Sequence, residues 1–171
     1  GVDAYSMSCH KWLQSPKGLG LLYVTPDVRA DLPRMWFKTP ERAMDGTARL
    51  YEDYSTRAWP AVVTLDDALA FQEAVGAAEK ERRYRALHAR VRDRVEAETQ
   101  LEWRSPMRWE LGSMIMAVGV RGRAAPELGG PLMDEHGTNV RTFGGDLNAV
   151  RVSPNLATTE AELDGFLDRL V

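Results

Sequence analysis

One lysine of this chain has neighbours that favour covalent chemistry. Lys11 stands between a histidine and a tryptophan in the run SMSCHKWLQSPKGLGLLYV. A lysine amine attacks a carbonyl only when it is partly deprotonated, which requires desolvation or a cationic neighbour. His10, Trp12 and Leu13 offer such surroundings. Ser8 and His10 add hydrogen-bond donors suited to an anion such as a phosphate group. A lysine beside an aromatic residue is also common on ordinary surfaces, so these residues alone leave both interpretations open.

The elements around this segment can be predicted from its pattern. DAYSMS alternates towards a short strand, GLGLLYVT is a continuous apolar run typical of a buried strand, and Pro26 opens a short helix. Residues 33–64 lack a sustained period, so we expect a long and mostly irregular connection. Loops of that length in a compact chain are usually functional. Trp36, Phe37 and Trp59 fall in this region, where we expect them to face the substrate.

Two helices are predicted next. From Leu65 one helical face carries the residues Leu65, Ala68, Leu69, Gln72 and Val75. After Gly76 a second helix carries an apolar stripe of Tyr84, Leu87, Val91 and Val95, with His88 partly buried beside it. Acidic and basic residues are interleaved on the opposite face of that helix. We interpret this face as a solvated surface rather than a nucleic-acid patch.

The remainder predicts a small α+β unit with an antiparallel sheet. LEWRS, GSMIMAVGV, NVRTF and AVRVS read as strands, PELGGPLMDEHG as a short helix, and TTEAELDGFLDRLV as a closing helix. Thr159 and Glu162 have capping-box spacing at the start of that last helix. Its buried face is expected to hold Leu163, Phe166, Leu167 and Leu170.

Composition limits the class of protein. The chain has 171 residues, a net charge of -3 and one cysteine. It offers no global attraction to nucleic acid or anionic membrane, no disulfide framework and no membrane-length apolar run. We therefore expect a cytoplasmic protein without nucleic-acid or membrane partners. His136 has no second cluster at ligand spacing, so no metal site is predicted. Because the chain lacks an initiator Met and its first residue falls just before a strand, we expect a fragment.

The string HKWLQSPKGLGLLYV resembles the cofactor-lysine segment of the class V aminotransferase family of pyridoxal-phosphate enzymes. That family has fold type I and includes cysteine desulfurases and isopenicillin-N-epimerase-like proteins. The resemblance implies that Lys11 is the Schiff-base lysine of pyridoxal 5'-phosphate. It also implies that Ser8 and His10 contact the cofactor phosphate.

A second segment, YSTRAWPAVVTLDDALAF, looks like the family's Gly-Thr segment. Its threonine reaches across a dimer to the phosphate of the other subunit, and Thr56 is the matching position. Ser55 replaces the usual glycine, which puts the backbone contact there in doubt. Thr47 in DGTAR is a rival at a less fitting distance.

The third segment, NAVRVSP, resembles the family's Arg-x-Ser motif, whose arginine binds the substrate α-carboxylate. Arg151 takes that position, and its planar guanidinium suits a carboxylate because it can form two parallel hydrogen bonds. By itself an arginine in an alternating strand is more simply its solvent face. Its register with the lysine and threonine segments favours the binding role.

The resemblance implies an α/β plus α+β architecture in two parts. Residues 1–77 would be the remainder of the large cofactor-binding domain, and residues 78–171 the small C-terminal domain. The implied chemistry acts at the α-carbon of an amino acid, by transamination, epimerisation or β-elimination. Cysteine desulfurases carry a nucleophilic cysteine shortly before the Arg-x-Ser motif, and DEHGTNVRTFGGDLN has none. The single cysteine, Cys9, reads as a packed small residue, so a persulfide route is disfavoured.

Other parts of the family's active site lie N-terminal to the lysine, and this chain has no room for them. We therefore expect weak cofactor binding and little turnover from this chain alone. It would be the C-terminal portion of a longer homodimeric enzyme, or a subunit that completes the site of a partner chain carrying the N-terminal half. A lysine-containing α/β domain without a cofactor is the third alternative.

Overall fold

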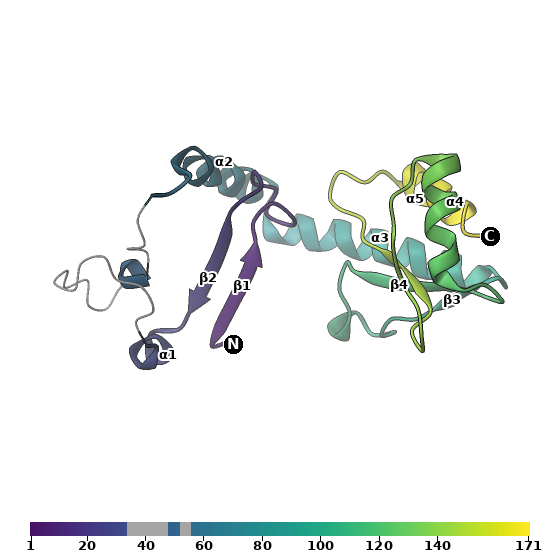
Figure 1. Cartoon of the computed structure of the whole chain (residues 1–171), viewed down its shortest axis with the longest axis horizontal. Coiled ribbons are helices and arrows are strands. Elements are labelled where there is room, and N and C mark those ends of the chain that lie inside the picture. Colours follow the sequence, from purple (N-terminus) through teal and green to yellow (C-terminus); the bar gives the residue numbers. More distant parts are fainter. Residues whose placement is uncertain (34–47, 52–55) are drawn as a thin grey trace. The chain divides into compact units, whose positions relative to one another are not determined.

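The structure, a computed structural model, describes residues 1–33, 48–51 and 56–171 (Figure 1). The chain divides into two compact units, Gly1–Val75 and Gly76–Val171. The sequence placed a boundary two residues later, between positions 77 and 78, and its assignment of a large and a small domain stays a prediction. Gly76 joins the two units at φ 78°, a backbone conformation that glycine adopts without steric cost.

The first unit, Gly1–Val75, is built on a β-hairpin (Figure 1). Its strands β1 (Ala4–Ser8) and β2 (Gly20–Val24) pair antiparallel, with Ala4 opposite Val24 and Ser8 opposite Gly20. Helix α1 (Pro26–Asp31) follows, then a 3-10 turn η1 (Ala48–Tyr51) and helix α2 (Trp59–Val75). The Tyr51 hydroxyl donates to the Arg29 carbonyl at 3.0 Å and so ties η1 to α1.

The run GLGLLYVT contains a strand, as predicted, but the expectation that this strand is buried is wrong for the described part of this unit. Leu22 is 65% exposed and Tyr23 55% exposed, although both belong to a continuous apolar run. Such runs are typical of strands covered on both faces of a sheet. The described part of this unit supplies no layer that covers them.

Helix α2 also differs from its prediction. It begins at Trp59 rather than at Leu65, because Pro60 is compatible with the first turn of a helix, where its missing N–H leaves no hydrogen bond unmade. On the predicted buried face, Ala68 is 8% exposed but Leu69 is 41% exposed. The irregular connection is therefore shorter at its C-terminal end than the sequence suggested.

The second unit, Gly76–Val171, holds a four-stranded sheet, as predicted. The strand order is β3-β4-β6-β5 and every neighbouring pair is antiparallel. In chain order its elements are α3 (Ala77–Ala97), β3 (Leu101–Trp103), η2 (Trp109–Leu111), β4 (Met116–Val120), η3 (Ala125–Leu128), α4 (Gly129–His136), β5 (Arg141–Phe143), β6 (Ala149–Val152) and α5 (Glu160–Asp168). The strands are shorter than predicted, and β4 begins only at Met116.

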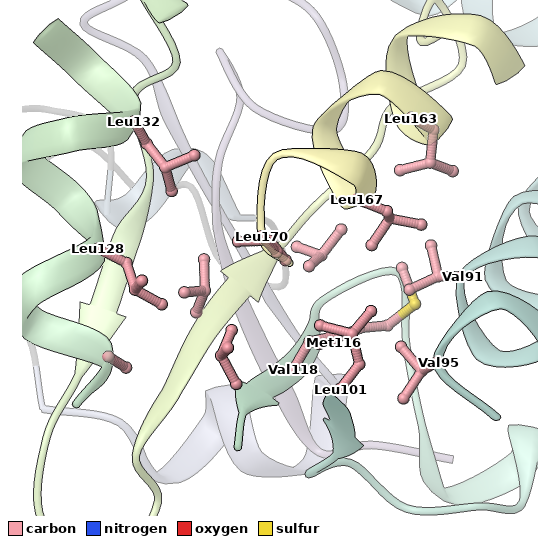
Figure 2. Packing of buried hydrophobic residues seen from close by; sticks show 14 of the residues in the cluster. Val91, Val95, Leu101, Met116, Val118, Leu128, Leu132, Leu163, Leu167 and Leu170 are labelled. Carbon is pink, nitrogen blue, oxygen red and sulfur yellow. The ribbon is translucent and has the colours of Figure 1, made fainter. Parts of the chain in front are cut away.

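The core of the second unit lies between one face of this sheet and its helices. Figure 2 shows Val91 and Val95 of α3 facing Leu163 and Leu167 beside Met116 of the sheet. The predicted apolar stripes are confirmed for the buried residues Leu87, Val91, Val95, Leu163, Leu167 and Leu170, while Tyr84 and Phe166 are partly buried against them.

Polar contacts stabilise the N-terminus of α5 and hold this helix against α3. The capping box is confirmed, since the Thr159 side chain accepts from the Glu162 N–H and the Glu162 carboxylate accepts from the Thr159 N–H. Arg90 of α3 pairs with Asp164 at 2.5 Å, and Arg94 pairs with Asp168 at 2.6 Å. The arginine-rich face of α3, predicted to be solvated, is therefore partly paired with acidic residues of α5.

His88 of α3 is more buried than the sequence predicted, with 3% of its surface exposed. Its ring lies edge-on between Trp103 and Trp109, with ring centroids 5.2 Å away from it in each case. Burial, aided by the charge of Arg92, lowers the pKa of His88 below its ordinary value. Both tryptophans are partly buried and pack against the core.

Candidate functional site

Lys11 lies on the loop that joins β1 to β2. At the base of this loop the Cys9 N–H donates to the Leu19 carbonyl at 3.1 Å, continuing the strand pairing by one residue. The Ser15 N–H donates to the Cys9 carbonyl at 3.2 Å and closes a smaller ring, residues 9–15. Cys9 is fully buried and Ser15 is 7% exposed. The lysine is thus carried on a short loop whose two ends are fixed.

The surroundings of Lys11 are less apolar than the sequence suggested. Lys11 and His10 are exposed, and Trp12 is 36% exposed. The described residues therefore do not bury the amine, and the expectation that its neighbours desolvate it is wrong for this chain. The Lys11 N–H donates to the Ser8 carbonyl at 3.4 Å, which holds the backbone of these two residues close together.

The chemistry of these side chains fits an anionic carbonyl compound. Residues 4–26 contain no aspartate or glutamate, whereas they contain Lys11, Lys17 and His10. Ser8, at the end of β1, adds a hydroxyl donor. A segment that offers an amine, an imidazole and a hydroxyl with no carboxylate suits a phosphate-bearing aldehyde, because it can donate hydrogen bonds without like-charge repulsion.

Thr56 belongs to the same unit and lies three residues before the start of α2, where it is exposed. Its rival Thr47, and Ser55 beside it, lie outside the described residues, as do Trp36 and Phe37. Trp59 is 58% exposed, and the Arg57 guanidinium lies 5.6 Å from its ring centroid. Trp59 is therefore a surface residue of this unit.

Arg151 lies in the second unit, at the third position of β6. Its neighbours Val150 and Val152 are buried while Arg151 is exposed, so its side chain is on the sheet face away from the core. Among the described residues it forms no ion pair. The predicted site residues are thus divided: Ser8, His10, Lys11 and Thr56 belong to the first unit and Arg151 to the second.

Sequence reasoning missed Arg141. It lies directly opposite Arg151 across the β5–β6 pair, so both guanidinium groups occupy the same sheet face. Arg141 lies 5.8 Å from the Phe143 ring centroid and, within the described residues, has no acidic partner. On the other side Arg151 is opposite Ala117, whose small side chain leaves its guanidinium uncovered. The alternation of NVRTF was visible in the sequence, but the register that pairs the two arginines was not.

Three further observations complete the description of the chain. Cys9 is a buried small residue, as predicted. The residues that the structure describes contain no group of three or more His, Cys, Asp or Glu placed to hold a metal ion. Within the same residues, no helix combines the length and the apolar character needed to span a bilayer.

Solved structures share the fold of this chain. Cysteine desulfurase from Thermococcus onnurineus NA1 matches with a TM-score of 0.78 at 19% identity, over 97% of this chain and 45% of that one. Alanine–glyoxylate aminotransferase from Nostoc sp. matches with a TM-score of 0.76 at 18% identity, over 99% and 47%. A C-DES variant with glycine covalently linked to its PLP cofactor matches with a TM-score of 0.77 at 21% identity, over 99% and 46%. At these identities the likeness establishes a mixed α/β fold of the fold type I kind.

The family of this chain is shown by its match to a protein-family model. Residues 1–166 match the aminotransferase class-V model, and the chain belongs to that family. The family prediction is confirmed, and the cofactor of the family is pyridoxal phosphate, as predicted. No curated protein sequence matches the chain. The chain spans about half the length of the solved structures that it resembles.

Proposed function

We propose that this chain is the C-terminal portion of a pyridoxal-phosphate enzyme that acts at the α-carbon of an amino acid, with Lys11 as its Schiff-base lysine. The observation that carries the proposal is the loop 9–15, which presents an exposed lysine amine beside the Ser8 and His10 donors in a segment without carboxylates. Residues 1–77 would belong to the large domain and 78–171 would form the small C-terminal domain.

Each predicted site residue has a chemical role in this proposal. Lys11 would hold the cofactor through its Nζ, the amine that would react with the cofactor aldehyde. Ser8, His10 and Thr56 donate hydrogen bonds to a phosphate, with Thr56 acting across a dimer. Pyridoxal phosphate, when bound, supplies the aldehyde and a ring that withdraws electron density from the substrate α-carbon. Lys11 Nζ would also be the group that accepts and returns the α-proton of the substrate.

Arg151 would bind the substrate carboxylate. An exposed guanidinium without an acidic partner among the described residues can offer two parallel N–H groups to a carboxylate. Arg141 adds a second positive charge on the same sheet face. Transamination, epimerisation and β-elimination all remain compatible with these groups. The sequence between residues 134 and 148 has no cysteine, which disfavours a persulfide route.

A second candidate function is that of a complementing subunit, which completes the active site of a partner chain. The exposed apolar run of β2 motivates it, because Leu22 and Tyr23 need a covering layer that a partner chain could supply. The two candidates differ in whether that layer belongs to the same polypeptide or to another one. The native mass, and the identity of the chains that co-purify, separate them. In both candidates we propose a cytoplasmic dimer.

The test compares Lys11 with Lys17, the second lysine of the connection between β1 and β2. The protein, with any chains that co-purify, is mixed with pyridoxal phosphate and treated with borohydride, which delivers hydride to the C=N carbon and makes the link permanent. Peptide mass spectrometry should place the adduct on Lys11 in the wild type. Lys11→Ala should lose it, and Lys17→Ala, an exposed lysine in the same connection, should keep it. An adduct that persists in Lys11→Ala would falsify the assignment.

A further inference from the structure

The described part of the first unit has four buried residues: Cys9, Ser15, Ala68 and Gln72. Two of them form the base of the Lys11 loop, and Gln72 comes from α2, far along the chain. The only well-packed region of the described unit is therefore the place where the Lys11 loop meets α2. A buried amide needs hydrogen-bond partners, and two acceptors of the Gln72 amide lie in that loop.

Gln72 makes two contacts with the loop through one atom. Its side-chain Nε2 donates to the Leu13 carbonyl at 3.3 Å and to the Gln14 Oε1 at 3.1 Å. Gln14 has φ 62°, a left-handed conformation that residues with a side chain rarely adopt without support. The Gln72 amide therefore contacts the loop at Gln14, the residue with the left-handed backbone conformation.

These contacts fix Lys11 from two sides. The Cys9 and Ser15 pairing holds the ends of the loop, and Gln72 holds its far side at Leu13, two residues after the lysine. Between these fixed points the Lys11 backbone has little freedom, while its side chain remains exposed. A nucleophile whose backbone is held in place loses less entropy when it forms a covalent bond.

We propose that Gln72 is a positioning residue for Lys11, a role that rests on the proposed function. Gln72 acts through the loop, where its amide donates to Leu13 and Gln14. When its amide is removed, the Leu13 carbonyl loses this donor and the Gln14 side chain loses one of its contacts, so the loop 9–15 samples more conformations. The fraction of protein whose Lys11 is held for attack on the cofactor aldehyde then falls.

The experiment uses Gln72→Leu and Gln72→Met, which both remove the donor without adding a charge, with Glu73→Gln as the matched control on an exposed neighbour. The Gln72→Met variant keeps the length of the side chain, so it guards against a simple packing loss. Amide hydrogen exchange of peptide 9–15, measured without cofactor, reports on the loop itself. Borohydride trapping at increasing pyridoxal phosphate concentrations then gives the apparent affinity of Lys11 for the aldehyde.

We expect both Gln72 variants to show faster exchange in peptide 9–15 and an apparent affinity for the aldehyde reduced by about two- to tenfold, the usual net effect of one hydrogen bond. Glu73→Gln should behave as the wild type in both assays. Unchanged exchange, or faster exchange with unchanged trapping, would overturn the positioning role. If the wild type itself traps no cofactor on Lys11, the proposed function fails and the positioning role fails with it, a result distinct from a defect confined to the Gln72 variants.

Discussion

The two units should respond very differently to the same substitution, because only one of them has a packed apolar core in its described part. Leu167 of α5 is fully buried, and it packs with Val91 and Met116 between the helices and the sheet (Figure 2). Its replacement by alanine removes buried methyl groups and leaves a cavity. We expect Leu167→Ala to lower the free energy of unfolding of the second unit by about 2–5 kcal/mol.

Leu22 of β2 provides the comparison in the first unit. It is 65% exposed, so about a third of its surface is removed from water. Complete burial of a leucine side chain contributes about 1.5–3 kcal/mol, so Leu22→Ala should cost roughly 0.5–1 kcal/mol in this chain alone. If another part of the enzyme that we propose covers β2, the same substitution should become a core substitution there, at about 2–5 kcal/mol.

Peptide-resolved hydrogen exchange measures the loss of stability in either variant, because each amide reports the opening free energy of its own segment. Peptides from α5 report on Leu167→Ala, and peptides from β1 and β2 report on Leu22→Ala. A loss above about 2 kcal/mol for Leu22→Ala in the chain alone would refute the reasoning, because an exposed leucine has too little buried surface to lose. The measurement is repeated at several protein concentrations, since self-association would also cover β2.

The remaining predictions concern pH and the substrate. Burial lowers the pKa of His88, so below about pH 6.5 the unfolded chain binds a proton that the folded chain does not. The second unit should therefore lose stability as the pH falls from about 7 towards the lowered pKa, and His88→Phe should show a shallower decline in urea unfolding between pH 7 and 5. Equal slopes in the two proteins would contradict this explanation. In the assembled enzyme, Arg151→Lys should raise the KM for an amino-acid substrate by on the order of tenfold, because an ammonium cannot form the two parallel bonds of a guanidinium. The effect should vanish for the corresponding amino-acid amide, which lacks the carboxylate, and an equal effect on both compounds would exclude carboxylate binding by Arg151.

The sequence by itself determined the family and most of the second unit. The string around Lys11 identified the family because local residue types and their order carry that signal, and residues 1–166 confirm it. The apolar stripes of α3 and α5 and the Thr159 capping box are set by helical periodicity and by local hydrogen bonding. Such features depend on residues only a few positions apart, so a linear pattern suffices to predict them.

The tertiary structure alone decided which distant residues come together. The pairing of β5 with β6 places Arg141 opposite Arg151, and no spacing in the sequence fixes that register. The contact of Gln72 with the loop around Leu13 and Gln14 joins residues nearly sixty positions apart. The apolar run of β2 predicted burial, yet its residues are exposed in this chain. An apolar run predicts that a strand will be buried, because its side chains are stabilised by removal from water. Whether they are buried in the structure depends on which other segments pack against the strand, and the local sequence does not specify those segments.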